Sequence, residues 1–260
     1  MAQVTVVTNN KGGVGKTTTA ANLAAALWLR GYDVLCIDLD GQANLTDVLG
    51  ASGAKVGSYD AMQGQKFITP VRVRTQAEGV GVLDVLPATA DLWALDVALA
   101  KKADRLTRFG EVVDKYRNNY DIIIIDTTPT MGNLSISALY AADNAVITTT
   151  PDIFSTRGLV SIKGAVDSIN GKRAVPLEVR VLFCMYDGRL SLHRLMAEKV
   201  RAAFKTFNTA IRKNVALAES PLESTDVLTY APKSNGAQDY IALAEEFARV
   251  NKLKHHKHQY

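Results

Sequence analysis

Residues 11–18 read Lys-Gly-Gly-Val-Gly-Lys-Thr-Thr, between an apolar run at residues 4–8 and an alanine-rich stretch at residues 20–29. A strand, a glycine-rich turn and a helix start in this order are typical of a phosphate-binding loop. The general pattern, Gly-x-x-x-x-Gly-Lys-[Ser/Thr], requires a glycine at residue 10, where this chain has Asn10. The chain has instead a glycine pair and a second lysine, Lys11.

The residue types of this loop predict the parts of a nucleotide site. Backbone N–H groups in a glycine-rich turn can approach phosphate oxygens, because glycine has no Cβ and tolerates positive φ. The start of the next helix, at Thr17 and Thr18, adds N–H groups and the positive end of the helix dipole. Lys16 is expected to reach the terminal phosphates, and the Thr17 hydroxyl to ligate Mg²⁺. The turn itself consists of Gly12, Gly13, Val14 and Gly15.

Three carboxylates follow predicted strands. Asp38 and Asp40 close the apolar run at residues 34–38, and their spacing of two places both on the same side of the pleat. A solubilising strand end would have the same spacing. Asp126 follows four consecutive isoleucines, which are typical of a parallel strand buried on both faces. A carboxylate at the carboxyl end of such a strand lies at the ligand crevice, so Asp126 is predicted to hold Mg²⁺, through a water.

The loop resembles the deviant phosphate loop of the ParA/MinD class of ATPases. The resemblance implies that the nucleotide is ATP and that the ATP-bound form is a homodimer. It also implies that Lys11 reaches the phosphates of the partner subunit, so Lys11 and Lys16 are both expected to be catalytic. A cationic group supplied in trans is worth about a thousandfold or more in rate in related systems.

Two further segments are similar to the partition ATPases of this class. Residues 34–46 resemble a strand that ends in Asp-x-Asp-Pro-Gln-Gly-Asn-x-Thr, with Gly41 in place of Pro and Ala43 in place of Gly. The resemblance places Asp38 near the metal and gives Asp40 the role of orienting the attacking water. Residues 120–132 resemble the segment in which Asp126 is the Walker B aspartate. The loop after it is expected to sense the γ-phosphate.

The carboxyl-terminal part, at residues 181–190, 211–221 and 231–237, is similar to that of Soj-like partition proteins. The resemblance implies an adenine pocket at Met185 and Ile211 and in the neighbouring Arg212. It also implies contacts with nonspecific DNA from Arg189, Arg212 and Lys213. Asp152, after the strand predicted at residues 145–150, is expected to contact Lys11 or the partner subunit.

Composition agrees with a DNA-binding surface but does not require one. The net charge is +4 and the isoelectric point is about 9.0. A helix predicted at residues 191–207 has apolar residues at helical spacing on one face and mostly basic residues on the other. Basic residues on this helix would track phosphates rather than read bases, although a merely solvated helix face has the same pattern.

Alternation of β-rich and helical segments predicts a doubly wound α/β fold, with a mainly parallel sheet and helices on both faces. We expect one P-loop ATPase domain at residues 1–251, followed by a basic, disordered tail at residues 252–260. Strands are predicted at residues 4–8, 34–38, 82–86, 121–126, 145–150 and 179–185. A weak strand is expected around Val71 and Val73. The first strand leaves no room for a signal peptide or for an N-terminal DNA-reading domain.

Cys36 and Cys184 lie inside predicted core strands, so both are expected to be reduced and packed. The predicted localisation is cytoplasmic and nucleoid-associated.

Two functional classes remain after this reading. The first is a partition or cargo-positioning ATPase whose ATP dimer binds DNA and is released when a ParB-like or other adaptor stimulates hydrolysis. The second is a MinD-like ATPase that cycles on a membrane, for which the predicted last helix, residues 237–253, would have to bind lipid. Acidic residues on that helix disfavour an anionic membrane, so no membrane partner is expected. A metabolic ligase on the same scaffold is a weaker third class.

Overall fold

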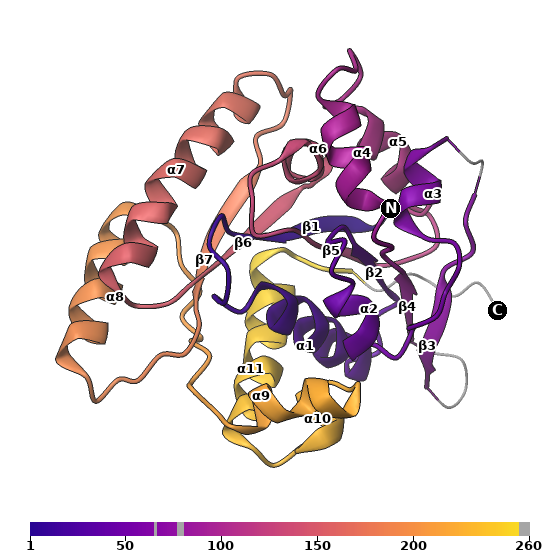
Figure 1. Cartoon of the computed structure of the whole chain (residues 1–260). Coiled ribbons are helices and arrows are strands. Elements are labelled where there is room, and N and C mark those ends of the chain that lie inside the picture. Colours follow the sequence, from indigo (N-terminus) through magenta and orange to yellow (C-terminus); the bar gives the residue numbers. More distant parts are fainter. Residues whose placement is uncertain (65–66, 77–80, 255–260) are drawn as a thin grey trace.

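The computed structural model describes residues 1–64, 67–76 and 81–254. Its centre is a seven-stranded sheet in the order β3-β4-β2-β5-β1-β6-β7 (Figure 1). Neighbouring strands are parallel except for β3, which pairs with β4 in the antiparallel sense. The strands are β1 (Gln3–Thr8), β2 (Val34–Asp38), β3 (Val71–Thr75), β4 (Val82–Leu86), β5 (Ile122–Asp126), β6 (Asn144–Thr149) and β7 (Glu178–Phe183).

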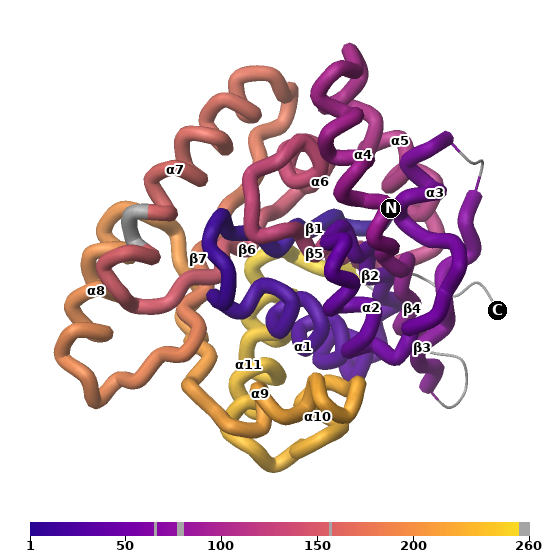
Figure 2. The backbone as a smooth tube through the Cα atoms, in the orientation of Figure 1, coloured from indigo at the N-terminus to yellow at the C-terminus, as the bar shows by residue number. Residues whose placement is uncertain are grey.

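Helices cover both faces of the sheet (Figure 1). One face is covered by α1 (Lys16–Leu29), α2 (Asn44–Val48), α10 (Val227–Tyr230) and α11 (Asn235–Val250). The other is covered by α3 (Ser58–Met62), α4 (Leu92–Leu99), α5 (Arg108–Asp114), α6 (Asn133–Ala141), α7 (Ile153–Asn170) and α8 (Ser191–Ala203). The short helix α9 (Ala216–Glu219) and the 3₁₀ helix η2 (Ser220–Glu223) precede α10. Helices α7 and α8 lie side by side at the β7 edge (Figure 2).

The isoleucine run of β5 explains why the sheet is covered on both faces. Ile123 and Ile125 belong to the core under α4–α8, whereas Ile122 and Ile124 belong to the core under α1 and α11. All four side chains are fully buried. Because successive side chains of a strand point to opposite faces, a strand without polar alternation requires a layer on each side.

The predicted strands are all present. The bounds at 34–38 and 82–86 are as predicted, the other strands have ends shifted by one or two residues, and the weak strand around Val71 and Val73 is β3. The fold class is therefore confirmed. The helix predicted at residues 191–207 was too long, since Phe204 has extended backbone and ends it. Residues 205–207 instead run beside β7, where Val181 N donates to the Lys205 carbonyl and Phe207 N donates to the Val181 carbonyl. The last helix is also shifted from the predicted residues 237–253, because the Ser234 side chain caps it at residue 235.

The apolar face of the last helix packs inside the protein. Tyr240, Leu243, Ala244 and Phe247 of α11 are buried, and α11 runs along α1. These four side chains of α11 therefore contact the core, while Ile241 on the same helix is exposed. In the described part of the chain, no helix combines the length and apolarity needed to span a membrane. The predicted basic tail lies outside the described residues from residue 255 onward.

Candidate nucleotide-binding site

The glycine-rich loop connects β1 to α1 and ends in a left-handed residue. Gly13 has φ of 71° and Gly15 has φ of 86°, which residues with a Cβ rarely adopt. Gly15 also lies close to the residue that follows β7, because a Cβ built on it would lie 3.3 Å from the Cys184 Sγ. The positive φ and the close packing both favour glycine at residue 15. Because α1 begins at the next residue, its first N–H groups face the loop.

Two asparagines hold the start of the loop. The Asn9 side chain accepts a hydrogen bond from Lys11 N at 3.0 Å and donates to the Thr148 carbonyl at 2.5 Å. Asn10 lies against α7, where a Cβ on Gly158 would come within 3.0 Å of the Asn10 Oδ1. Asn10, which breaks the general loop pattern, thus contacts a neighbouring helix. The anchoring role of Asn9 was not predicted, because a lone asparagine after a strand is a common turn residue.

Lys16 crosses the loop. Its Nζ donates a hydrogen bond to the Lys11 carbonyl at 3.2 Å, and the residue is 7% exposed. Burial lowers the pKa of Lys16, and the nearby carboxylates of Asp126 and Asp40 act in the opposite direction. The ammonium is therefore held at the loop, where it faces two carboxylates.

Thr17 and Asp126 form the pair expected of a magnesium site. The Thr17 hydroxyl donates to the Asp126 carboxylate at 2.6 Å, which leaves the hydroxyl oxygen able to ligate a cation. Burial raises the pKa of Asp126, as does Asp38, while Thr17 and Lys16 act to lower it. Bound magnesium keeps several waters and takes few protein ligands. Among the described residues, no group of three or more His, Cys, Asp or Glu side chains is placed so that it could hold a metal ion.

Asp38, the last residue of β2, and Asp40, two residues later, have different surroundings. The Asp38 carboxylate accepts from Asp40 N at 3.0 Å, from Thr46 N at 3.0 Å and from the Thr46 hydroxyl at 2.8 Å. Burial raises the pKa of Asp38 to about 6, against these three hydrogen bonds. Both Asp38 oxygens thus hold the loop in place, whereas Asp40 accepts from Gln42 N through one oxygen.

A cavity of about 280 Å³ lies between the phosphate loop and the Asp40 loop. Most of the predicted phosphate-binding residues line it together with Asp40, whereas Lys11, Val14, Asp38 and Asp126 do not. Its lining is Gly12, Gly13, Gly15, Lys16, Thr17, Thr18, Asp40, Gln42, Asn44 and Pro129.

A second cavity of about 250 Å³ adjoins the loop at Gly15 and Thr18. The predicted adenine residues Met185, Ile211 and Arg212 all line it, and Met185 has a left-handed φ of 55°. Leu217, Ala218 and Tyr240 also line this cavity. These three were not predicted, because α9 and α11 are far from the phosphate loop in the sequence and come beside it only in the folded chain.

Lys11 lies at the surface beside α7. Its Nζ is 3.4 Å from an Asp152 carboxylate oxygen and 2.9 Å from the Ser155 hydroxyl, and its side chain is 42% exposed. The predicted neighbours Lys11 and Asp152 are thus in contact within one chain. Whether Asp152 contacts a partner subunit stays a prediction.

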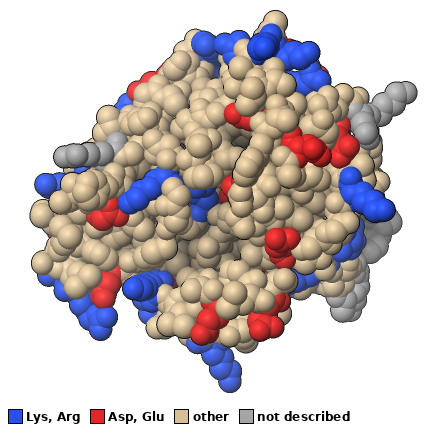
Figure 3. Space-filling model, viewed as in Figure 1, with Lys and Arg blue, Asp and Glu red and all other residues tan. Residues whose placement is uncertain are grey.

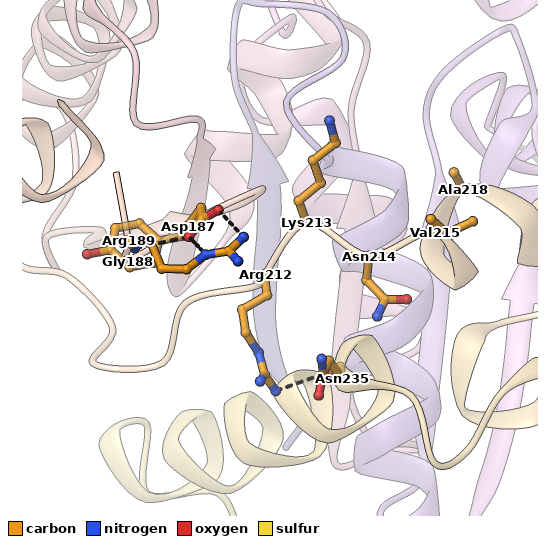
Figure 4. A pocket seen from close by; sticks show the side chains of 10 residues that line it. Asp187, Gly188, Arg189, Arg212, Lys213, Asn214, Val215, Ala218 and Asn235 are labelled. Atoms are coloured by element: carbon orange, nitrogen blue, oxygen red, sulfur yellow. Dashed lines mark hydrogen bonds and ion pairs between the residues drawn. The ribbon is translucent and has the colours of Figure 1, made fainter. Parts of the chain in front are cut away.

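The predicted DNA-binding residues surround one groove of about 790 Å³ (Figure 4). Arg189 forms an ion pair with Asp187 at 2.7 Å, and Arg212 forms one with Asp239 at 2.7 Å. Lys213 makes no ion pair with any residue in the described ranges. On the visible face of the molecule, basic and acidic side chains are interspersed (Figure 3). Because two of its three basic residues are paired with carboxylates, the groove has less net positive charge than three basic residues alone would give.

The fold and the loop define a P-loop nucleotide-binding protein. A family model described as an AAA domain matches residues 2–179. Sporulation initiation inhibitor protein Soj of Bacillus subtilis is 36% identical over 253 residues, which cover 95% of this chain and 99% of that protein. Chromosome partitioning protein ParA of Caulobacter vibrioides is 36% identical over 251 residues, which cover 94% and 93%. The chain belongs to the ParA/MinD-like family of P-loop ATPases.

Solved structures share the whole fold. Cobyrinic acid a,c-diamide synthase from Mycobacterium smegmatis, with bound ATP analog and magnesium, superposes with a TM-score of 0.82 at 27% identity and covers 97% of this chain and 96% of its own. The septum site-determining protein MinD from Pyrococcus horikoshii, complexed with Mg-ADP, has a TM-score of 0.78 at 26% identity, with 96% and 98% covered. Both neighbours hold an adenine nucleotide and magnesium.

Proposed function

We propose that this chain is an ATP-dependent partition or cargo-positioning ATPase. Its ATP-bound homodimer binds nonspecific DNA, and a ParB-like or other adaptor stimulates hydrolysis and release. The observation that carries the proposal is the phosphate loop with two lysines, Lys11 and Lys16, whose cradle also contains Asp40. The Thr17 hydroxyl lies 2.6 Å from Asp126 beside this cradle. Identity of 36% with Soj and with ParA over nearly the whole chain supports the partition class.

The residues fit ATP and magnesium. Loop N–H groups and Lys16 would bind the phosphates, while Thr17 and Asp126 would hold Mg²⁺, with Asp38 nearby. The metal, when bound, would neutralise charge on the phosphate oxygens. Asp40 would orient a water for attack on the γ-phosphate, and phosphoryl transfer requires little more than such positioning and charge stabilisation. The cavity at Met185 and Ile211 would take the adenine.

Lys11 is the group that would make hydrolysis depend on dimerisation. Its side chain is about half exposed at the surface, and its ammonium contacts Asp152 and Ser155. An exposed ion pair of this kind contributes about 0.2–1 kcal/mol, so little free energy would be lost when Lys11 turned to a partner's phosphates. The small free energy of the contact with Asp152 therefore supports a Lys11 side chain that can turn toward a partner subunit.

DNA is the favoured surface for the dimer, which would place the protein in the cytoplasm at the nucleoid. The groove with Arg189, Arg212 and Lys213 faces away from the core and adjoins the adenine pocket through Arg212 and Lys213. The membrane-cycling alternative loses support because the apolar face of α11 is buried against α1. A metabolic ligase shares the fold, but the synthase neighbour is 27% identical, compared with 36% for Soj.

Hydrolysis by two variants tests the proposal. Lys11→Ala should bind ATP but hydrolyse it about a thousandfold more slowly, as expected for loss of a cationic group in trans. Asp40→Ala should bind ATP, remain a dimer by light scattering and stay on DNA. Wild-type hydrolysis by Lys11→Ala, or a monomeric Asp40→Ala with ATP, would contradict the proposed mechanism.

A further inference from the structure

Helix α4 contacts the loop that carries Asp40. The Trp93 indole lies over Gly41, and a Cβ built on Gly41 would overlap the ring. The φ of Gly41 lies outside the left-handed region, so its backbone conformation alone would allow a side chain. The need for glycine at residue 41 therefore comes from the indole. Trp93 is 55% exposed, so burial in the core does not account for its position.

The same helix contacts the loop after Asp126. One turn beyond Trp93, the Asp96 carboxylate accepts a hydrogen bond from Leu134 N at 2.7 Å, at the start of α6. A Cβ on Gly132 would lie 2.6 Å from an Asp96 carboxylate oxygen, although Gly132 has an ordinary φ of −71°. A side chain at residue 132 would thus also displace a side chain of α4, although the backbone of Gly132 would allow one.

Both contacts are made from one side of α4, because residues three apart share a helix face. A cavity of about 310 Å³ lies between α4, the loop that carries Asp40 and the loop after Asp126. Its lining includes Asp40, Gln42, Trp93, Asp96, Thr128 and Pro129. Helix α4 therefore bridges the two segments that flank the phosphate cradle at Asp40 and Pro129.

The indole contacts the Asp40 loop at its glycine. Glycine has more backbone freedom than any other residue, so a contact at this position limits the loop where its backbone could vary most. Beyond Gly41, the loop is held by the hydrogen bonds to Asp38 and by Ala43 N, which donates to the Asp40 carbonyl at 2.8 Å. Trp93 adds a contact at the residue next to Asp40, where a small displacement changes the direction of the carboxylate.

We propose that Trp93 and Asp96 are positioning residues, and that α4 clamps the Asp40 loop and the 127–132 loop in the geometry that hydrolysis requires. The clamp rests on the proposed ATPase function. It acts on the orientation of Asp40 and leaves the loop that binds the phosphates unchanged. Its removal should therefore slow turnover without weakening nucleotide binding.

A rescue experiment tests the clamp. With saturating DNA and Mg²⁺, Trp93→Ala should lower kcat for ATP hydrolysis about tenfold and change KM less than twofold. Gly41→Ala should also lower kcat, because the new Cβ displaces the indole. The double variant Trp93→Ala/Gly41→Ala should recover most of the wild-type kcat, since the Cβ then has room and alanine restricts the loop backbone. Val97→Ala, an exposed position on α4, is the matched control and should keep wild-type kcat.

The outcomes separate the clamp from the ATPase proposal. Binding of a fluorescent ATP analogue and thermal unfolding show whether each variant is folded and loaded. Wild-type kcat in Trp93→Ala would overturn the clamp but not the ATPase proposal. The same would follow if the kcat of the double variant were no higher than expected from multiplying the two single losses. A wild-type chain that bound but never hydrolysed ATP would overturn the ATPase proposal and the clamp with it.

Discussion

At the scale of single residues, the Thr17 hydroxyl joins the phosphate loop to Asp126. Thr17→Val keeps the shape of the side chain but removes the oxygen that would ligate Mg²⁺ and leaves Asp126 without this donor. We expect Mg²⁺ to tighten ATP binding in the wild type, and this gain to fall about tenfold, or 1.4 kcal/mol, in the variant. Titration of a fluorescent ATP analogue with Mg²⁺ and with EDTA measures it.

Thr18→Val is the matched control, because no residue in the described ranges forms a hydrogen bond with the Thr18 hydroxyl. It should keep the full effect of Mg²⁺. An unchanged effect of Mg²⁺ in Thr17→Val would remove Thr17 from the metal site.

The cysteines are buried and reduced, as predicted. Burial raises the pKa of Cys184 to about 12, and a hydrogen bond with Thr19 acts in the opposite direction. Burial likewise raises the pKa of Cys36. Since thiolate is the reactive form, neither thiol should react with an aromatic disulfide reagent at pH 8 in the native protein.

In urea, both cysteines should react at once. Rapid reaction of one thiol in native protein would contradict the packing, and single Cys36→Ser and Cys184→Ser variants would identify it.

At the scale of helices and strands, hydrophobic patterns predicted the parallel sheet and the cradle well. Isoleucines 122–125 required two covered faces, and the carboxylates at the ends of β2 and β5 had to meet at one sheet edge. The end of α8 was not predictable in this way, because Phe204 has a helical apolar spacing and is drawn out of the helix by pairing beside β7. Nor could spacing reveal Trp93 over Gly41, since they meet only when α4 packs onto the sheet.

Gly15, in the loop before α1, and Gly164, inside α7, should respond to alanine in opposite directions. Gly15→Ala places a Cβ at φ of 86° and against Cys184, so it should destabilise the fold by about 1–2 kcal/mol and weaken ATP binding. Gly164→Ala lies in exposed α7 with no atom near the new Cβ, and it should stabilise the protein by about 0.5–1 kcal/mol. Urea unfolding measures both free energies. Equal effects of the two substitutions would contradict the loop geometry.

At the scale of the whole molecule, ion pairs change what the basic groove can contribute to DNA binding. Arg189 and Arg212 already face Asp187 and Asp239, whereas Lys213 has no ion-pair partner among the described residues. Each phosphate contact of a basic residue adds about one to the slope of log K against log salt. Lys213→Ala should therefore lower that slope by about one and weaken binding more than Arg189→Ala does. The reverse order would mean that DNA displaces Asp187 from Arg189.

The central claim is that the protein binds nonspecific DNA as an ATP-bound dimer and leaves it after hydrolysis. Sedimentation on nonspecific DNA tests this claim most directly. The protein should be incubated with ATP, with ADP or without nucleotide, and in parallel with liposomes of anionic lipid. We predict that the wild-type protein sediments with DNA only when ATP and Mg²⁺ are present, and that it does not sediment with liposomes. The Asp40→Ala variant with ATP should stay bound to DNA. Sedimentation with liposomes in ATP, or equal DNA binding in all three nucleotide states, would contradict the account.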